Sequence, residues 1–346
     1  MKPPWRKDLN GDPLPWLWEL DADRPGVRYF TLLDILDMPP DHVYVVAARQ
    51  GVMASGPVPA ILSNQNPQGY WIRPGTGYLP KYQGTIWSVI FLAQLGADGN
   101  DPRVRAACEY VLEHSCCTLG GFSYDGQPGG TIQCLQGNLC AALIDLGWLN
   151  DDRLRKALDW LARSVTGEGI APAEEQNNPQ RYYSSGNSAP GFVCAANNQK
   201  PCAWAAVKAL LAFSKVPESL RTPEIWAPIQ AGLGFLLGRD PARADYPAPF
   251  ASPPSPRWFQ FGYPLADASD VLQNLEVLTA LGYAGDPRLN AAYALLLSKQ
   301  DLQGRWKLES TGNGRTWADV EREGEPSKWV TLRALRVLKR RAEALL

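Results

Sequence analysis

Apolar and polar positions follow a helical period along most of the chain, and glycine turns interrupt it at regular places. Almost wholly apolar stretches end in Leu-Gly, as in IWSVIFLAQLG and LCAALIDLG, and the stretches after them carry charges on one face, as in RVRAACEYVLEH and RLRKALDWLA. Such a period predicts helices. Glycine ends the first helix, and Asp-Pro or Asp-Asp starts the second. The pattern therefore predicts helical hairpins.

The hairpin pattern covers nearly the whole chain. The copies lie at about 82–122, 132–170 and 267–306, with weaker ones at 30–71 and 202–240 and a partial one at 328–346. Residues 1–28 are expected to be an N-terminal extension, and roughly 171–200 and 241–264 to be long loops. Since the first helix of each pair is the more apolar, we predict one all-α domain with two concentric layers. An open solenoid and a closed ring remain alternatives.

Composition and charge remove several classes of function. The 346 residues carry 34 basic and 35 acidic side chains, and the longest basic run is LKRR, so nothing indicates nucleic-acid binding. The apolar stretches are too short to span a membrane, and the first residues lack the apolar core of a signal peptide. We expect a cytoplasmic protein. The basic residues of the last helix (Arg333, Arg336, Lys339, Arg340) are expected on a solvated face, with peripheral contact to anionic lipid as an alternative.

Two turns share one spacing. LSNQNPQGYW holds Gln65, Gly69 and Trp71, and LSKQDLQGRW holds the same residue types at 300, 304 and 306. Hairpins of about 50 residues with such turns resemble the QW repeats of squalene-hopene cyclases and the related protein prenyltransferase β-subunits; monodomain class II terpene cyclases of meroterpenoid pathways are nearest in size. The resemblance implies an α/α toroid of the α6/α6 type and an isoprenoid or lipid-like ligand in a central cavity.

The resemblance also directs attention to two acids. Class II cyclases protonate an alkene with an aspartic acid of a DxDD motif at the start of an inner helix, without a cofactor. Here the motif reads DASD, with Asp267 and Asp270 at its ends and Ser269 in place of the second Asp. Asp270 first and Asp267 second are the candidate acids, which burial or a like charge would keep protonated. A helix cap is the alternative role.

Aromatic residues gather at the predicted hairpin ends. They would line the cavity and stabilise a carbocation through cation–π attraction, or line a pocket for a lipid tail, or simply pack loops. The candidates for substrate binding are Tyr82, Trp87, Trp204, Trp258, Phe259, Phe261, Tyr263 and Trp329, with Trp317 in a comparable place.

Three cysteines provide a competing site. Cys134, Cys194 and Cys202 lie at or before the starts of neighbouring inner helices, where they could converge on zinc with His114, Cys116 or Cys117 as a fourth ligand. Buried free thiols and a disulfide are the alternatives. The prenyltransferase pattern of Asp, Cys and His ligands is not present, and the chain has only two histidines.

The leading hypothesis is an isoprenoid-processing enzyme of the class II terpene-cyclase type. The alternatives are a non-catalytic toroid that binds a lipid or a protein around a structural Cys/zinc site, and a zinc-dependent prenyltransferase-like enzyme. Toroidal enzymes that cleave polysaccharides with paired acids are a further class, which the QW spacing disfavours.

Overall fold

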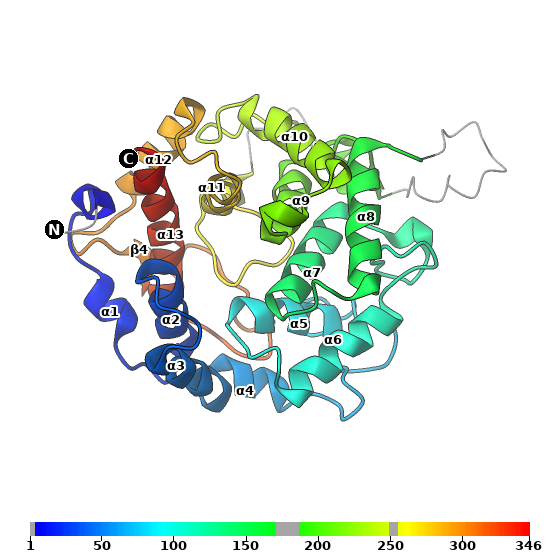
Figure 1. Ribbon diagram of the computed structural model, residues 1–346, viewed down its shortest axis with the longest axis horizontal. Helices are drawn as coiled ribbons and strands as arrows, with labels where there is room; N and C mark the ends of the chain where they lie inside the picture. Colours follow the sequence, from blue (N-terminus) through cyan, green and yellow to red (C-terminus); the bar gives the residue numbers. More distant parts are fainter. Residues whose placement is uncertain (1–3, 171–186, 249–254) are drawn as a thin grey trace.

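The structure is a computed structural model that describes residues 4–170, 187–248 and 255–346. This part of the chain is mostly helical, as predicted, and its helices follow one another around a ring (Figure 1). The predicted loops at 171–200 and 241–264 lie partly outside the described residues. None of the described helices is both long enough and apolar enough to cross a membrane.

Most side chains of the inner helices are buried, and from the second inner helix to the last each contacts the next in chain order. They are α2 (Pro25–Phe30), which continues into the π-helix η2 (Thr31–Ile35), then α5 (Thr85–Gln94), α7 (Gln133–Asp145), α9 (Ala203–Lys215), α11 (Val271–Ala280) and α13 (Lys328–Ala344). Because α13 also contacts α2 and η2, the last inner helix lies against the first.

The outer helices each pack on an inner helix. They are α3 (Val43–Ala54) with α4 (Pro57–Leu62), α6 (Pro102–His114), α8 (Asp152–Thr166), α10 (Pro223–Leu237), and α12 (Asn290–Ser298) after the 3-10 turn η8 (Pro287–Leu289). The predicted caps are present: Asp101 and Asp151 each accept a hydrogen bond from the backbone N–H two residues later.

The first hairpin begins earlier than predicted, at residue 25 rather than 30. Its outer helix is divided at Gly56, which has φ +71° and is followed by proline. A residue at positive φ cannot continue an α-helix, and proline then starts the next one.

Short strands and 3-10 turns occupy the connections. Strands β1 (Ser188–Ala189), β2 (Val193–Cys194) and β3 (Lys200–Pro201) form one antiparallel sheet, and β4 (Trp306–Lys307) pairs with β5 (Pro326–Ser327). The 3-10 turns are η3 (Pro128–Gly130), η5 (Ala195–Asn197), η6 (Glu218–Leu220) and η7 (Pro256–Phe259). Strands of two residues are too short to leave an alternating hydrophobic pattern, so the all-α prediction missed them.

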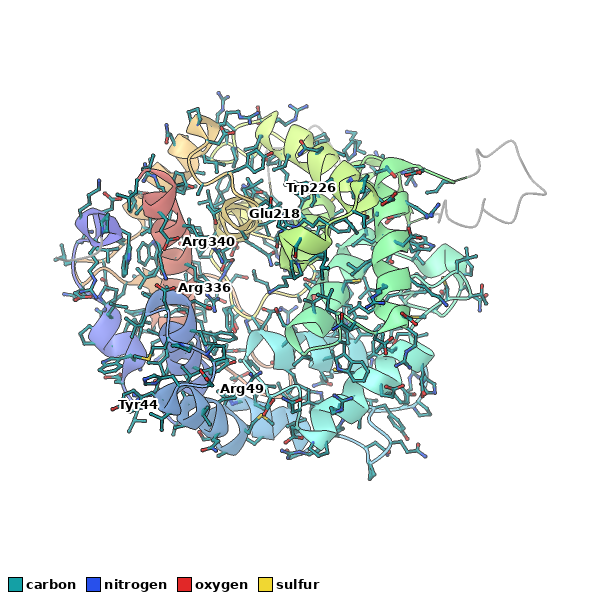
Figure 2. All side chains as sticks on the ribbon, viewed as in Figure 1. Tyr44, Arg49, Glu218, Trp226, Arg336 and Arg340 are labelled. Carbon is teal, nitrogen blue, oxygen red and sulfur yellow. The ribbon has the colours of Figure 1, made fainter. Side chains whose placement is uncertain are left out.

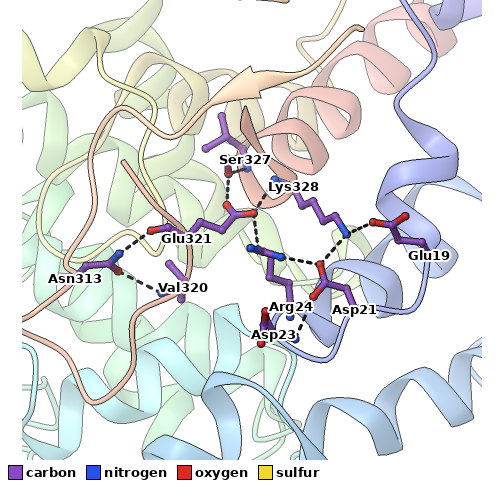
Figure 3. A network of polar contacts seen from close by, with 10 residues as sticks. Glu19, Asp21, Asp23, Arg24, Asn313, Val320, Glu321, Ser327 and Lys328 are labelled. Carbon is purple, nitrogen blue, oxygen red and sulfur yellow. Dashed lines mark hydrogen bonds and ion pairs between the residues drawn. The ribbon is translucent and has the colours of Figure 1, made fainter. Parts of the chain in front are cut away.

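The N-terminal segment packs on the outside of α13. Its elements η1 (Pro4–Asp8) and α1 (Leu14–Trp18) both contact that helix, so the chain's two ends meet in one wall of the ring. Figure 3 shows the ionic network there: Lys328 Nζ lies 2.7 Å from both Glu19 and Asp21, and Arg24 joins Asp21 to the buried Glu321. Burial raises the pKa of Glu321.

The two QxxxGxW turns have matching hydrogen bonds. Trp71 and Trp306 each donate Nε1–H to the carbonyl ten residues earlier, at 2.9 and 2.8 Å. Gln65 donates to a carbonyl at the start of α6, and Gln300 donates to a carbonyl at the end of η1, at 2.9 and 3.0 Å. These turns tie neighbouring units together on the outside of the ring.

Candidate functional site

The segment before α11 lies in the interior of the ring, where it appears as the yellow loop of Figure 1. We call residues 260–269 the central segment. Gln94 of α5 holds it from one wall, since Gln94 Nε2 donates to Leu265 O at 2.7 Å and Leu265 N donates to Gln94 Oε1 at 2.8 Å. Asn138 of α7 donates to Ala266 O, and Arg333 of α13 donates to Gly262 O at 2.7 Å. The central segment is therefore tied to three inner helices.

Asp270 directly follows the central segment and is the N-cap of α11. Its Oδ1 accepts from Gln273 N at 2.6 Å and its Oδ2 from Gly262 N at 3.0 Å, and both oxygens bind the guanidinium of Arg333 at 2.9 Å. The side chain is almost fully buried. A carboxylate has about four lone-pair positions, so this one is fully used by structural partners.

Arg333 is one of the basic residues expected on a solvated face, and that expectation was wrong. Arg333 is 2% exposed and binds Glu276 as well as Asp270. Its charge is needed inside the ring because a buried carboxylate without a counterion is very costly. Lys339 is also buried, which contradicts the same prediction.

Asp267, by contrast, is only partly buried. It accepts hydrogen bonds from Lys81 Nζ at 3.0 Å and from the Tyr82 hydroxyl at 3.1 Å. Burial alone would raise the pKa of Asp267, but Lys81 outweighs it, and the pKa lies below the usual value. The same pair raises the pKa of Lys81 to about 12. In this arrangement Asp267 is an anion.

The predicted aromatic residues do not form one lining. Tyr82 and Trp87 pack edge to face near Tyr78, at the same end of the ring as Asp267, and Tyr263 stacks on Trp329 with ring centroids 4.3 Å apart.

The remaining aromatic candidates lie elsewhere. Trp258 packs on Tyr246 and donates to Pro241 O, Phe261 is buried beneath the ammonium of Lys299, and Phe259 and Trp204 are partly buried. Trp317, the comparable residue, donates Nε1–H to Gln83 O at 2.9 Å, just before α5.

The three predicted thiols lie near one another. Cys202 donates a hydrogen bond to Cys194, and this bond lowers the pKa of Cys194 to about 6. The thiol of Cys134 interacts electrostatically with Cys194 and Asp267, and burial raises its pKa to about 12. Within the described residues, however, no group of three or more His, Cys, Asp or Glu side chains has the arrangement needed to hold a metal ion. Zinc therefore stays a prediction.

One functional candidate was missed in the sequence. Lys208 of α9 is completely buried, its Nζ has no hydrogen-bond partner in the described part of the chain, and it interacts electrostatically with Asp270. A single lysine inside the apolar stretch CAWAAVKALLAF was the available signal, because an inner helix has no solvated face for it.

A cavity of about 380 Å³ lies in the ring where the inner helices end, with the central segment as part of its wall. Figure 2 shows Arg336 and Arg340 beside this hollow on α13, and Arg49 beside it from α3. Tyr263 is the single residue of the eight aromatic substrate-binding candidates among the lining residues. The family resemblance implied an apolar cavity lined by the N-terminal ends of the inner helices, whereas this cavity is lined by their C-terminal ends and by charged side chains.

Comparisons with known proteins give distant similarities. No protein-family model matches the chain, and no curated protein matches it. Among solved structures it is similar to type II terpene cyclase MstE from Scytonema, at 14% identity over 83% of this chain and 96% of that one, with a TM-score of 0.32. A variant of the same cyclase in complex with geranylgeranyl dihydroxybenzoate gives 15% identity, 83% and 95% coverage and a TM-score of 0.30.

A family 10 polysaccharide lyase from Cellvibrio cellulosa is similar at 14% identity over 68% of this chain and 81% of that one, with a TM-score of 0.33. TM-scores of this size do not establish a shared fold.

Proposed function

We propose that the protein is an isoprenoid-processing enzyme of the class II terpene-cyclase type, built as an α/α toroid, and that Asp267 is its proton donor. The observation that carries this proposal is the position of Asp267: a partly accessible carboxyl group on a segment inside the ring, bonded to Lys81 and Tyr82 beside the ring of Trp87. The isoprenoid substrate is proposed because the QxxxGxW turns resemble the QW repeats of squalene-hopene cyclases.

The contacts of Asp267 suggest how it becomes an acid. Burial is the largest influence on its pKa and acts to raise it, while the ion pair with Lys81 lowers it. The Lys81 side chain is 42% exposed, so an apolar chain entering beside Asp267 can displace it toward solvent. Without that ammonium the burial contribution dominates, and the carboxyl group takes up a proton that it can deliver to an alkene.

Asp270, the first candidate from the motif, is proposed to position the site. Its ion pair with Arg333 and its bond to Gly262 N fix the two ends of the central segment around Asp267. A positioning role agrees with its full set of partners.

The test is conversion of linear polyprenyl substrates, from farnesol to squalene, followed by gas chromatography with mass spectrometry. Asp267→Asn is expected to abolish cyclised product while keeping the fold. Lys81→Met is expected to retain product and to shift the alkaline limb of the pH–rate profile to higher pH, because it removes the ammonium that keeps Asp267 ionised. Cyclisation by Asp267→Asn at the wild-type rate would reject the assignment.

The alternative is a non-catalytic toroid that binds a lipid or a partner. It is favoured by the ionised state of Asp267 in the structure, since an anion cannot protonate an alkene. Mass spectrometry of a hydrophobic molecule that co-purifies with the protein would distinguish the two: a linear ligand recovered unchanged supports binding, and a cyclic product supports catalysis.

A further inference from the structure

The cavity at the ends of the inner helices is strongly charged. Five cationic and three anionic side chains line it. Three of the cations have carboxylate partners in the same lining: Arg336 with Asp34, Lys215 with Asp145, and Arg333 with Glu276. The remaining two are Arg49 and Arg340.

Arg340 has no ion pair within 4.0 Å among the described residues. Its one hydrogen bond goes to the carbonyl of Glu276 at 3.4 Å, which is long. It lies one helical turn after Arg336, and burial together with the charge of Arg336 lowers the pKa of Arg340. Like charges at this spacing repel one another, and Asp34 binds Arg336 but makes no ion pair with Arg340 within 4.0 Å.

Arg49 is also incompletely paired. Its Nη2 donates to Ala97 O at 3.1 Å, and its guanidinium lies on the ring of Tyr29 at 4.9 Å. Its Nε is buried and has no hydrogen-bond acceptor in the described part of the chain, since the nearest carboxylate oxygen, on Asp98, is 3.9 Å away. The hydroxyl of Tyr29, which also lines the cavity, has no hydrogen bond within the described ranges.

The ends of the inner helices account only in part for these two cations, since Arg340 donates to Glu276 O and Arg49 donates to Ala97 O. Free carbonyls at helix ends attract positive charge, but the carbonyls here accept hydrogen bonds from the turns that follow. At the end of α5, Leu95 N and Ala97 N donate to carbonyls of the last turn, and at the end of α11, Leu281 N and Tyr283 N do the same. Arg49 and Arg340 therefore keep N–H donors that point to an anionic ligand.

We propose that this cavity binds the oxyanion group of a small amphipathic acid, a carboxylate or a phosphate, through Arg340, Arg49 and the Tyr29 hydroxyl. Guanidinium groups bind both kinds of anion through paired N–H donors. Aliphatic side chains between the charges, among them Ile90, Leu211 and Val277, receive the apolar part of the ligand. Since Asp267 is absent from this lining, the site does not depend on the proposed cyclisation.

Isothermal titration calorimetry of the full-length protein tests the proposal with two probes, inorganic pyrophosphate and 4-phenylbutyrate. At least one is expected to bind, and raising the salt concentration should weaken it. Arg340→Gln is expected to weaken binding about 10-fold to 100-fold, as the loss of a hydrogen bond to a charged group does. Arg49→Gln and Tyr29→Phe provide further variants if Arg340→Gln folds poorly by circular dichroism.

Arg155→Gln, on the exposed face of α8, is the matched control and should bind as wild type does. Asp267→Asn should also bind normally, which separates this site from the proton donor. Binding of pyrophosphate alone would identify a phosphate-bearing ligand, and binding of phenylbutyrate alone a carboxylic acid. Absence of binding for both probes, or unchanged affinity in correctly folded Arg340→Gln and Arg49→Gln, would overturn the proposal.

Discussion

Replacement of Lys208 by methionine is expected to stabilise the protein. Lys208 is completely buried, and burial lowers the pKa of its ammonium group to about 7. The charges of Asp270 and Asp267 oppose this shift, whereas the charge of Arg333 adds to it. Methionine has a similar length and fills the same space without a charge.

The magnitude follows from the pKa. A fall from 10.5 to about 7 corresponds to about 5 kcal/mol, at roughly 1.4 kcal/mol per pH unit. Below pH 7 both the folded and the unfolded state carry the charge, so folding bears the full cost. Between pH 7 and 10.5 the unfolded state binds more protons than the folded state, so stability rises with pH and the cost disappears.

Urea unfolding at pH 6 and pH 9 measures this effect. The gain from Lys208→Met should approach about 5 kcal/mol at pH 6 and fall to about 2 kcal/mol at pH 9. Lys215→Met, at the partly exposed end of the same helix, is the control and should change stability by less than about 1 kcal/mol. A gain that is absent at pH 6, or that does not shrink at pH 9, would refute the reasoning.

Three further predictions concern other parts of the molecule. Asp270→Asn should lower the free energy of unfolding by about 3 kcal/mol in urea denaturation, because it breaks a buried ion pair; an unchanged free energy of unfolding would contradict this role. Gly69→Ala should lower the free energy of unfolding by at least about 2 kcal/mol in thermal denaturation, since the added Cβ would lie 2.4 Å from a backbone oxygen. Gly147→Ala, at a similar φ but in open space, should lower it by about 1 kcal/mol. Metal analysis tests the thiol site: without zinc, Cys194 should be alkylated fastest at pH 7, and Cys202→Ala should slow its alkylation by removing the hydrogen bond that lowers its pKa.

The hairpins could be predicted because their signals are local. Leu-Gly followed by Asp-Pro-Arg specifies a helix end and a helix start within about ten residues, and Asp101 and Asp151 cap helices where the pattern places them. The thiol cluster was predictable for a related reason, since residues at the starts of successive inner helices meet at one end of the ring.

The site could be predicted only in part because its decisive contacts are distant in sequence. Asp270 and Asp267 stand three residues apart in one motif, yet Asp270 is bound by Arg333, 63 residues later, and Asp267 by Lys81, 186 residues earlier. Nothing in DASD distinguishes the carboxyl group that is fully bonded from the one that is partly accessible. The charged cavity could not be predicted for the same reason, because its lining residues come from several helices that are far apart in sequence.

The partners of the two acids also decide which can change its protonation state. Releasing Asp270 requires breaking a bidentate, fully buried ion pair, which costs several kcal/mol and leaves Arg333 without one of its two carboxylates. Releasing Asp267 requires moving one lysine whose side chain is already 42% exposed, and exposed pairs of this kind contribute about 1 kcal/mol or less. An apolar ligand that buries a single methyl or methylene group gains enough free energy to release Asp267. Releasing Asp270 would instead require the wall of the ring to rearrange. Proton transfer at Asp267 is therefore compatible with a rigid ring, whereas at Asp270 it is not.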